Sequence, residues 1–259
     1  MRVVILAGGL GTRLREETEF RPKPMVEIGG RPILWHIMKL FAYYGYRDFV
    51  ICLGYKGDAI KEYFLDYEAM NNDFTIRLGS PNKIEFHSNH AEDGWMVTLA
   101  DTGENTMTGA RIKRIEKYVG AERFMATYGD GVADIDINKL VEFHDAHGRI
   151  ASLTSVRPQS RFGELIINDG RVAEFSEKPQ SSVGHINGGF FVFEPAIFDY
   201  LRDSDDCVLE QEPMHNLCAD KQLMAYKHEG FWQCMDTIRD HNLLQEMWQK
   251  NAASWKVWK

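Results

Sequence analysis

The sequence has little of what disulfide-bonded or membrane-spanning proteins require. Its four cysteines show no CxxC spacing, so we expect reduced thiols rather than a disulfide framework or a zinc site. No apolar run has the length of a membrane span, and the first residues lack a basic segment followed by a long apolar core and a cleavage site. We therefore expect a cytoplasmic protein with no membrane partner.

Positively charged residues are fewer than negatively charged ones. The chain has 30 Lys and Arg residues against 38 Asp and Glu, a net charge of −8 at pH 7. The negative electrostatic field of such a chain disfavours nucleic acid as a partner, so a phosphate ligand would need local cations, main-chain N–H groups or a metal ion.

With 259 residues, of which 44% are hydrophobic, the chain can bury a large core.

Short buried runs alternate with helix-period stretches, which predicts an α/β fold. A helix is expected over 31–45, with Pro32 at its start and Gly45 just after its end. Further helices are expected near 57–66, 136–148, 195–201, 210–218 and 239–250, and strands over 2–7, 48–54, 123–130, 150–156 and 186–194. This alternation indicates a Rossmann-like, mixed but mainly parallel sheet flanked by helices.

Two stretches depart from the βαβ pattern. Short candidate strands at 74–78, 83–88 and 95–100 suggest a small antiparallel insertion. Residues 162–177 predict a hairpin with Asp169-Gly170 as its turn. We expect a single domain over 1–259, with insertions near 74–102 and 200–220.

A glycine loop, LAGGLGTRL at residues 6–14, follows the first strand. Leu14 stands where a dinucleotide fingerprint has its third glycine, and Thr12-Arg13 stands where a P-loop has Lys-Ser/Thr. The loop nevertheless lies at the carboxyl end of a strand, where open α/β sheets bind ligands. Its glycines let main-chain N–H groups approach an anion, and Arg13 adds donors suited to phosphate.

Two further segments point to a family. Lys23 is held between Pro22 and Pro24, in a stretch expected to be stiff and extended. LAGGLGTRL, PKPM at 22–25 and GGRPIL at 29–34 together resemble the sugar-1-phosphate nucleotidyltransferases, also called sugar-nucleotide pyrophosphorylases. The resemblance implies a Rossmann-like sheet with a nucleotide at the end of the first strand.

The resemblance continues at 127–136 (TYGDGVADID), 175–179 (FSEKP), 186–193 (INGGFFVF) and 230–237 (GFWQCMDT). It implies that Asp130 and Asp236 hold Mg²⁺, that Arg13, Lys23 and Asp130 are catalytic, and that Lys178 positions the sugar phosphate. The implied nucleotide-binding residues are Leu6, Ala7, Gly8, Gly9, Gly11, Thr12, Arg13, Lys23, Thr106, Thr108, Arg111 and Gly129. The implied sugar-phosphate-binding residues are Glu177, Lys178, Asn187 and Gly188.

One difference from the usual pattern of the family indicates which branch the sequence most resembles. Glu16 stands where many family members have proline, and this feature, with 101–115 and 230–240, most resembles the cytidylyl branch. That branch would use CTP and glucose 1-phosphate and would release pyrophosphate and CDP-glucose, which feeds dideoxyhexose synthesis for lipopolysaccharide O antigen. A homo-oligomer, hexameric by resemblance, is also implied. Thymidylyl and uridylyl transfer remain open, because the base-reading residues are not located by the sequence.

The implied reaction needs no general base, since the attacking sugar-phosphate oxygen is ionised at neutral pH. It needs cations that neutralise two polyanions and hold them in line. Two rivals remain open. Asp134-Ile135-Asp136 resembles the D-x-D motif of metal-dependent glycosyltransferases, and a silent nucleotide-sugar sensor would also keep the fold.

Some residues have a simpler interpretation. Thr108-Gly109 is typical of a helix start, so Thr108 could act as a cap instead of a nucleotide ligand. His144 and His147 are interpreted as an exposed helix face, not a metal pair. The aromatic residues Trp248, Trp255 and Trp258 are interpreted as packing or a subunit contact.

Overall fold

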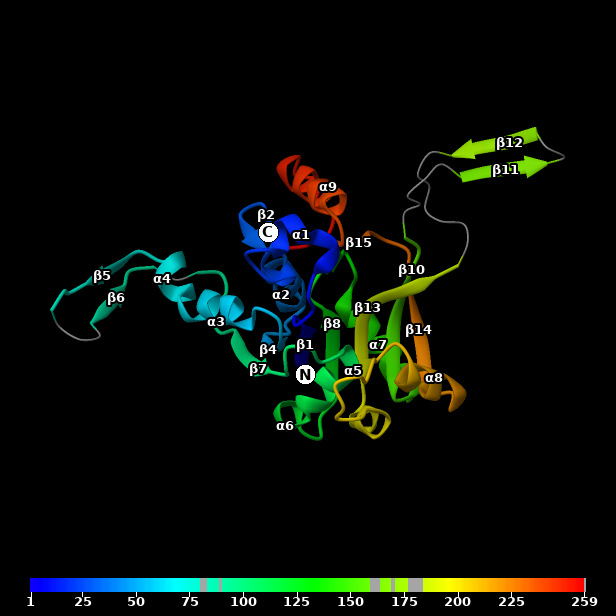
Figure 1. The fold of residues 1–259 in the computed structure, drawn as a ribbon, viewed down its shortest axis with the longest axis horizontal. Coiled ribbons are helices and arrows are strands. Elements are labelled where there is room, and N and C mark those ends of the chain that lie inside the picture. Colours follow the sequence, from blue (N-terminus) through cyan, green and yellow to red (C-terminus); the bar gives the residue numbers. More distant parts are fainter. Residues whose placement is uncertain (80–82, 89, 159–163, 169–170, 177–183, 259) are drawn as a thin grey trace.

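The computed structural model describes residues 1–79, 83–88, 90–158, 164–168, 171–176 and 184–258 (Figure 1). A central sheet contains seven described strands in the order β14-β10-β13-β8-β1-β4-β7. These strands are β1 (Arg2–Leu6), β4 (Asp48–Leu53), β7 (Met96–Asp101), β8 (Phe124–Tyr128), β10 (Ala151–Val156), β13 (Ile186–Phe193) and β14 (Leu223–His228). The pairs β1–β4, β1–β8, β4–β7 and β10–β14 are parallel, whereas β13 is antiparallel to both of its neighbours.

Helices cover both faces of the sheet. They are α1 (Arg15–Thr18), α2 (Ile33–Tyr43), α3 (Gly57–Leu65), α4 (Tyr67–Asn71), α5 (Thr108–Arg114), α6 (Glu116–Val119), α7 (Ile137–His147), α8 (Glu212–Ala219) and α9 (Ile238–Gln249), with 3-10 turns η1 (Thr12–Leu14), η2 (Lys23–Met25) and η3 (Pro195–Tyr200). The expected Rossmann-like, mainly parallel sheet flanked by helices is therefore confirmed.

The central strands are buried on both faces, which explains their continuous apolar runs. In β1, Val3 and Ile5 belong to the core beneath α2, α7 and α9, and Val4 and Leu6 belong to the core beneath α5, α6 and α8. Because side chains alternate along a strand, one short run of apolar residues fills both cores.

The described residues also form four small antiparallel pairs outside this sheet. They are β2 (Glu27–Ile28) with β3 (Arg31–Pro32), β5 (Phe74–Ile76) with β6 (Ile84–Phe86), β9 (Gly131–Ala133) with β15 (Trp232–Cys234), and β11 (Glu164–Asn168) with β12 (Arg171–Ser176). The β5–β6 hairpin extends away from the sheet beyond α3 and α4 (Figure 1). Both strands of the predicted 162–177 hairpin are present, and its Asp169-Gly170 turn lies outside the described residues.

Residues 95–100 were predicted to be a strand of the small antiparallel insertion, and this prediction was wrong. These residues belong to β7, which pairs in parallel with β4 at the edge of the central sheet. A single strand read alone does not show the direction of its partner, because hydrophobic alternation is the same in both arrangements. Of the three candidate strands, only the first two pair with each other in an antiparallel arrangement, as β5 and β6.

The C-terminal tryptophans pack around a buried histidine on α2. Trp255 is fully buried, and its indole N–H donates to Nδ1 of His36 over 3.3 Å. Nε2 of His36 donates to the Ile28 carbonyl over 2.8 Å, so the imidazole is held as one neutral tautomer. Burial lowers the pKa of His36 to about 4. The interpretation of Trp255 as packing is confirmed.

His144 does not lie on an exposed helix face, so that interpretation was wrong for this residue. It is buried against the sheet, where its Nδ1 bonds to the Ser152 hydroxyl over 2.8 Å and its Nε2 lies 3.2 Å from Glu194.

In the described part of the chain, none of the helices combines the length and apolar character that crossing a bilayer requires.

Candidate active site

A cavity of about 440 Å³ opens at the carboxyl end of β1, where the glycine loop leaves the sheet. This position agrees with the rule that open α/β sheets bind ligands at the carboxyl ends of their strands. The cavity is lined by Leu6, Ala7, Gly8, Gly9, Leu10, Gly11, Thr12, Lys23, Pro24, Glu104, Asn105, Thr106, Met107, Thr108, Arg111, Tyr128, Gly129, Asp130 and Asp236. It is large enough for a small-molecule ligand.

Close main-chain approaches explain the glycines of the loop. A Cβ at Gly8 would collide with the Arg111 guanidinium, which donates to the Gly8 carbonyl over 2.9 Å. Gly11 has a φ of +63°, in the left-handed region, and its carbonyl accepts from the hydroxyl of Thr18 over 3.1 Å. The loop therefore brings main chain close to its neighbours along the cavity wall. The side chain of Arg13 lies outside the described part of the structure.

Lys23 stands at the end of the cavity, between the two aspartates singled out in the sequence. An extended conformation was expected at Lys23, but it is the preceding residue, Pro22, that has it. Lys23 instead begins the 3-10 turn η2, and a proline near the start of such a turn, here Pro24, is favourable. Its Nζ lies 2.6 Å from Oδ2 of Asp130 and 2.5 Å from Oδ1 of Asp236. The side chains of the three residues are 12%, 28% and 21% exposed, respectively.

Pairing of β9 with β15 brings the two aspartates together. Asp130 immediately precedes β9 and Asp236 follows β15, and the Met235 N–H donates to the Asp130 carbonyl over 2.8 Å. Thr237 and Asp240 form a capping box at the start of α9. The Asp240 carboxylate also accepts a hydrogen bond from the main-chain N–H of Asp236. Asp236 is thus held at a defined place between a strand and a helix start.

The electrostatics of this cluster favour a cation. Burial acts to lower the pKa of Lys23, but the Asp130 and Asp236 carboxylates outweigh it, and the pKa is raised above its usual value. The lysine is therefore a fully charged ammonium group at neutral pH. Two carboxylates that converge on one cation are also suitable ligands for Mg²⁺, which prefers oxygen donors and retains waters or phosphate oxygens in its remaining positions.

Arg111 reaches the cavity from α5 but is mostly engaged with main chain. Its guanidinium donates to the carbonyls of Gly8, Leu53, Gly103 and Glu104 and to the hydroxyl of Thr102, over 2.7 to 3.2 Å. Burial lowers the pKa of Arg111, but an arginine side chain stays charged at neutral pH. Arg111 thereby ties the glycine loop to the segment that forms the opposite wall.

Thr106 and Thr108 also line the cavity, and both hydroxyls are already bonded to protein. Thr106 donates to Asp205 over 2.9 Å, whereas Thr108 donates to Glu210 over 2.7 Å. Thr108 is the first residue of α5, and Met107 is the N-cap, so the alternative interpretation of Thr108 as a capping side chain was wrong.

The sugar-phosphate residues are only partly within the described structure. Glu177 and Lys178 lie outside it. Asn187, on β13, does not line the cavity but donates to the Tyr128 hydroxyl over 3.0 Å, and Tyr128 does line it. The Gly188 carbonyl accepts from the Trp232 indole over 2.8 Å.

The rival D-x-D motif is not part of the cavity wall. Oδ1 of Asp134 lies 3.0 Å from Nε2 of His228, and Asp136 is the N-cap of α7, where it accepts from the Lys139 N–H over 3.1 Å. Both aspartates therefore have structural roles in this arrangement.

Sequence reasoning missed several cavity residues. These are Leu10, Pro24, Glu104, Asn105, Met107 and Tyr128. Glu104 and Asn105 follow β7 at the same edge of the sheet as the glycine loop, so the carboxyl-end rule would have indicated them had β7 been assigned to the central sheet. Tyr128 directly precedes Gly129 and Asp130, but no pattern distinguished it from an ordinary strand residue.

Comparison with known proteins gives the family. The model of a family described as nucleotidyl transferase matches residues 2–240. Proteins named glucose-1-phosphate cytidylyltransferase, from Salmonella typhimurium and Salmonella typhi, are each 52% identical over 100% of both chains. The solved structure of a UDP-glucose pyrophosphorylase complexed with UDP-glucose has the same fold, with a TM-score of 0.68 at 15% identity over 96% of this chain and 98% of that one. The chain therefore belongs to the nucleotidyl transferase family.

Proposed function

We propose that the chain transfers the cytidylyl group of CTP to glucose 1-phosphate, giving CDP-glucose and pyrophosphate. The observation that carries this proposal is the sequence identity of 52%, over the full length of both chains, to proteins named for that reaction. The geometry agrees with it, since a main-chain wall suited to phosphates and a strongly charged lysine line the same cavity.

In the proposed reaction an ionised oxygen of glucose 1-phosphate attacks the α-phosphorus of CTP. The bond between the α-phosphorus and the bridging oxygen breaks, and pyrophosphate leaves with that oxygen. No proton has to be removed from the nucleophile, so the protein contributes position and charge. The glycine loop would hold the triphosphate, and Arg13 and Lys23 would neutralise the charge that develops on the leaving pyrophosphate.

Asp130 and Asp236 would hold Mg²⁺. A bound Mg²⁺ supplies charge neutralisation and orientation of phosphate oxygens. The two carboxylates already bind a cation in the form of Lys23, which supports their assignment as metal ligands. Asp130 and Asp236 would hold the ion, and Lys23, which lies against the same carboxylates, would add its own positive charge to the site of the triphosphate.

The sugar phosphate would bind beside Tyr128, with Glu177, Lys178, Asn187 and Gly188 as its residues. Asn187 supports this placement, because its amide bonds to the Tyr128 hydroxyl at the cavity edge.

The same proposal includes a cytoplasmic location and the use of CDP-glucose for surface polysaccharide.

We also propose a homo-oligomer, hexameric by family resemblance. The β5–β6 hairpin supports it. Phe74 pairs with Phe86 and Ile76 with Ile84, so the four apolar side chains share one face, and each is between 41% and 50% exposed. An isolated two-stranded hairpin is marginal in water, and burial of this face against a second copy would stabilise it.

The decisive assay is pyrophosphate release with CTP, UTP, dTTP, ATP or GTP against glucose 1-phosphate and its epimers. Preference for CTP and glucose 1-phosphate is expected. A clear preference for dTTP or UTP would overturn the cytidylyl assignment and keep the family. Transfer from a finished nucleotide sugar, without pyrophosphate exchange, would favour the glycosyltransferase alternative, and binding without turnover would favour a sensor.

A further inference from the structure

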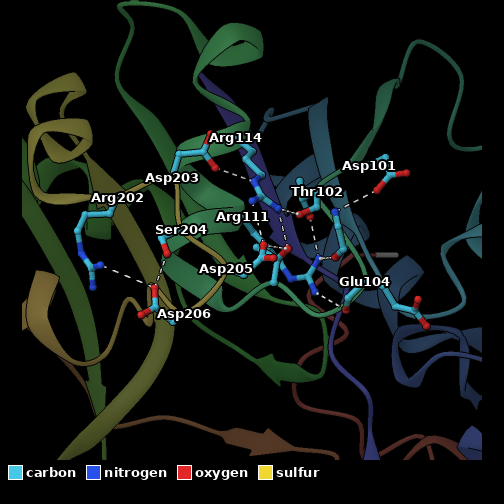
Figure 2. Close-up of polar contacts among 12 residues, drawn as sticks. Asp101, Thr102, Glu104, Arg111, Arg114, Arg202, Asp203, Ser204, Asp205 and Asp206 are labelled. Atoms are coloured by element: carbon cyan, nitrogen blue, oxygen red, sulfur yellow. Dashed lines mark hydrogen bonds and ion pairs between the residues drawn. The ribbon is translucent and has the colours of Figure 1, made fainter.

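Two arginines on α5 hold the same wall of the cavity from different sides (Figure 2). Arg111 lines the cavity and bonds to the carbonyls of Gly103 and Glu104. Arg114, one turn further along α5, does not line the cavity. Its Nη1 donates to the Thr102 carbonyl over 2.8 Å and to the Thr106 hydroxyl over 2.7 Å. The segment between these two threonines is therefore fixed at both ends by Arg114.

A second segment, residues 203–206, completes the arrangement. Nε of Arg114 donates to Asp203 over 2.8 Å, and its Nη2 lies 2.9 Å from Oδ1 of Asp205. The same Oδ1 accepts from the Thr106 hydroxyl, and the Asp205 carbonyl accepts from the Met107 N–H over 2.8 Å. Thr106 is thus held by an arginine and a carboxylate together.

The part of the wall that faces ligand depends on these bonds. Thr102 and Thr106 are buried, whereas Glu104 and Asn105 between them are exposed and line the cavity. Gly103 has a φ of +93° and makes the turn between the threonines. If Thr106 loses Arg114 and the Asp205 carboxylate, the wall keeps the Arg111 contacts and the main-chain N–H bonds of Gly103 to Asp101 and of Met107 to the Asp205 carbonyl. Glu104 and Asn105 between these points can then shift relative to the glycine loop.

We propose that Arg114, together with Asp205, is a positioning residue for the nucleotide. It sets the place of residues 103–107 and so determines the affinity for the nucleoside triphosphate and the discrimination between bases, without touching the ligand. The inference rests on the proposed function for the identity of the nucleotide.

The effect is expected to be local, not a general loss of stability. The Asp203 and Asp205 side chains are 63% and 66% exposed, and ion pairs in such surroundings contribute little to folding. The bonds to the Thr102 carbonyl and the Thr106 hydroxyl lie further inside and are directional, and they determine where the wall stands.

The chain offers a matched control in Arg123. Its side chain is 30% exposed, against 29% for Arg114, and it also pairs with two carboxylates, Asp145 and Glu194. Neither Arg123 nor its partners line the cavity. A variant at this position reports the cost of losing a surface arginine network elsewhere in the fold.

The test compares the steady-state kinetics of Arg114→Ala and Arg123→Ala. For Arg114→Ala we expect the KM for CTP to rise about tenfold, with kcat and the KM for glucose 1-phosphate within about twofold of the wild type. The ratio of kcat/KM for CTP to that for UTP should fall. Arg123→Ala should change none of these values.

Two further variants separate positioning from simple damage. Asp205→Asn should reproduce the rise in KM for CTP, and the double variant should be no worse than Arg114→Ala, because both changes break one unit. Arg114→Lys should recover only part of the affinity, since an ammonium group cannot reach four acceptors in the geometry of a guanidinium. An unchanged KM for CTP in Arg114→Ala, or equal rises for both substrates, would overturn the inference.

Calorimetric titration of CTP without sugar phosphate distinguishes failure of the inference from failure of the proposed function. Weaker CTP binding by Arg114→Ala than by Arg123→Ala supports the positioning role even if the wild-type protein transfers no cytidylyl group. Equal binding by both variants overturns it. If the wild type uses a different triphosphate, the proposed function is wrong, and the same two variants are compared with that triphosphate.

Discussion

Lys23 and Asp130 are 107 positions apart in the sequence, and in the folded chain Nζ of Lys23 lies 2.6 Å from Oδ2 of Asp130. Asp236 approaches the same ammonium group from the other side. The lysine therefore bridges two carboxylates within the cavity wall and offsets part of their negative charge. Because one ammonium group faces two carboxylates, a polyanion that enters would need a divalent cation at this place as well.

Replacing this lysine should abolish turnover and leave the fold in place. For Lys23→Ala and Asp130→Asn we expect pyrophosphate release to fall by at least about a hundredfold, the typical effect of losing one group that stabilises developing charge. The measurement is kcat at saturating substrates, with circular dichroism to check the fold. Near-wild-type turnover in either variant would show that its proposed role is wrong.

Lys39→Ala is the matched control for the lysine. Lys39 is also 12% exposed and also pairs with a buried carboxylate, Glu92, over 2.7 Å, but neither residue lines the cavity. This variant should lose stability and keep turnover. A similar loss of turnover in both variants would indicate general damage to the fold.

Removal of divalent metal should stop the reaction. We expect protein treated with EDTA to release no pyrophosphate and addition of Mg²⁺ to restore release, because without the divalent ion the Asp130 and Asp236 carboxylates would repel the triphosphate. Asp236→Asn should raise the Mg²⁺ concentration needed for half-maximal activity. Asp134→Asn should not, because Asp134 pairs with His228 outside the cavity. A requirement for Asp134 in place of Asp236 would favour the D-x-D alternative.

Acid should destabilise the protein through His36. Burial lowers its pKa to about 4 in the folded chain, while the unfolded value is 6.5. The unfolded state therefore binds the proton first, and the stability present above pH 6.5 is lost as the pH falls toward 4. The shift corresponds to about 3 kcal/mol at most.

Urea denaturation at pH 7, 6 and 5 tests this dependence. His36→Gln keeps one donor and one acceptor but does not titrate, so its free energy of unfolding should fall less between pH 7 and pH 5 than that of the wild type. The same slope in both proteins would assign the acid sensitivity to other groups.

The β5–β6 hairpin should control assembly. Phe86→Lys places a charge on its apolar face and should lower the oligomer mass measured by sedimentation. Thr75→Lys changes the opposite face of the same hairpin and should leave the mass unchanged. A monomeric wild-type protein, or equal dissociation by both variants, would contradict the assigned interface.

Prediction from the sequence was most successful where local physics decides the outcome. The alternation of buried runs with helix-period stretches was enough to place β1, α2 and α7, because burial and helix termination depend on neighbouring residues. Gly148 after α7 and Gly45 after α2 have positive φ values, as helix ends favour. The partner of β7 was mistaken, because strand direction depends on a contact with a distant segment.

The chemical types at the cavity were also determined by the sequence: a glycine loop after a buried strand, a lysine between prolines, and two aspartates far apart. Only the tertiary structure decided which of them meet. Pairing of β9 with β15 places Asp130 and Asp236 on one ammonium group, and α5 brings Arg114 to the Thr106 hydroxyl without making it part of the cavity lining. The physical reason is that local patterns set burial and helix boundaries, whereas charged groups are brought together by strand pairing across long stretches of chain.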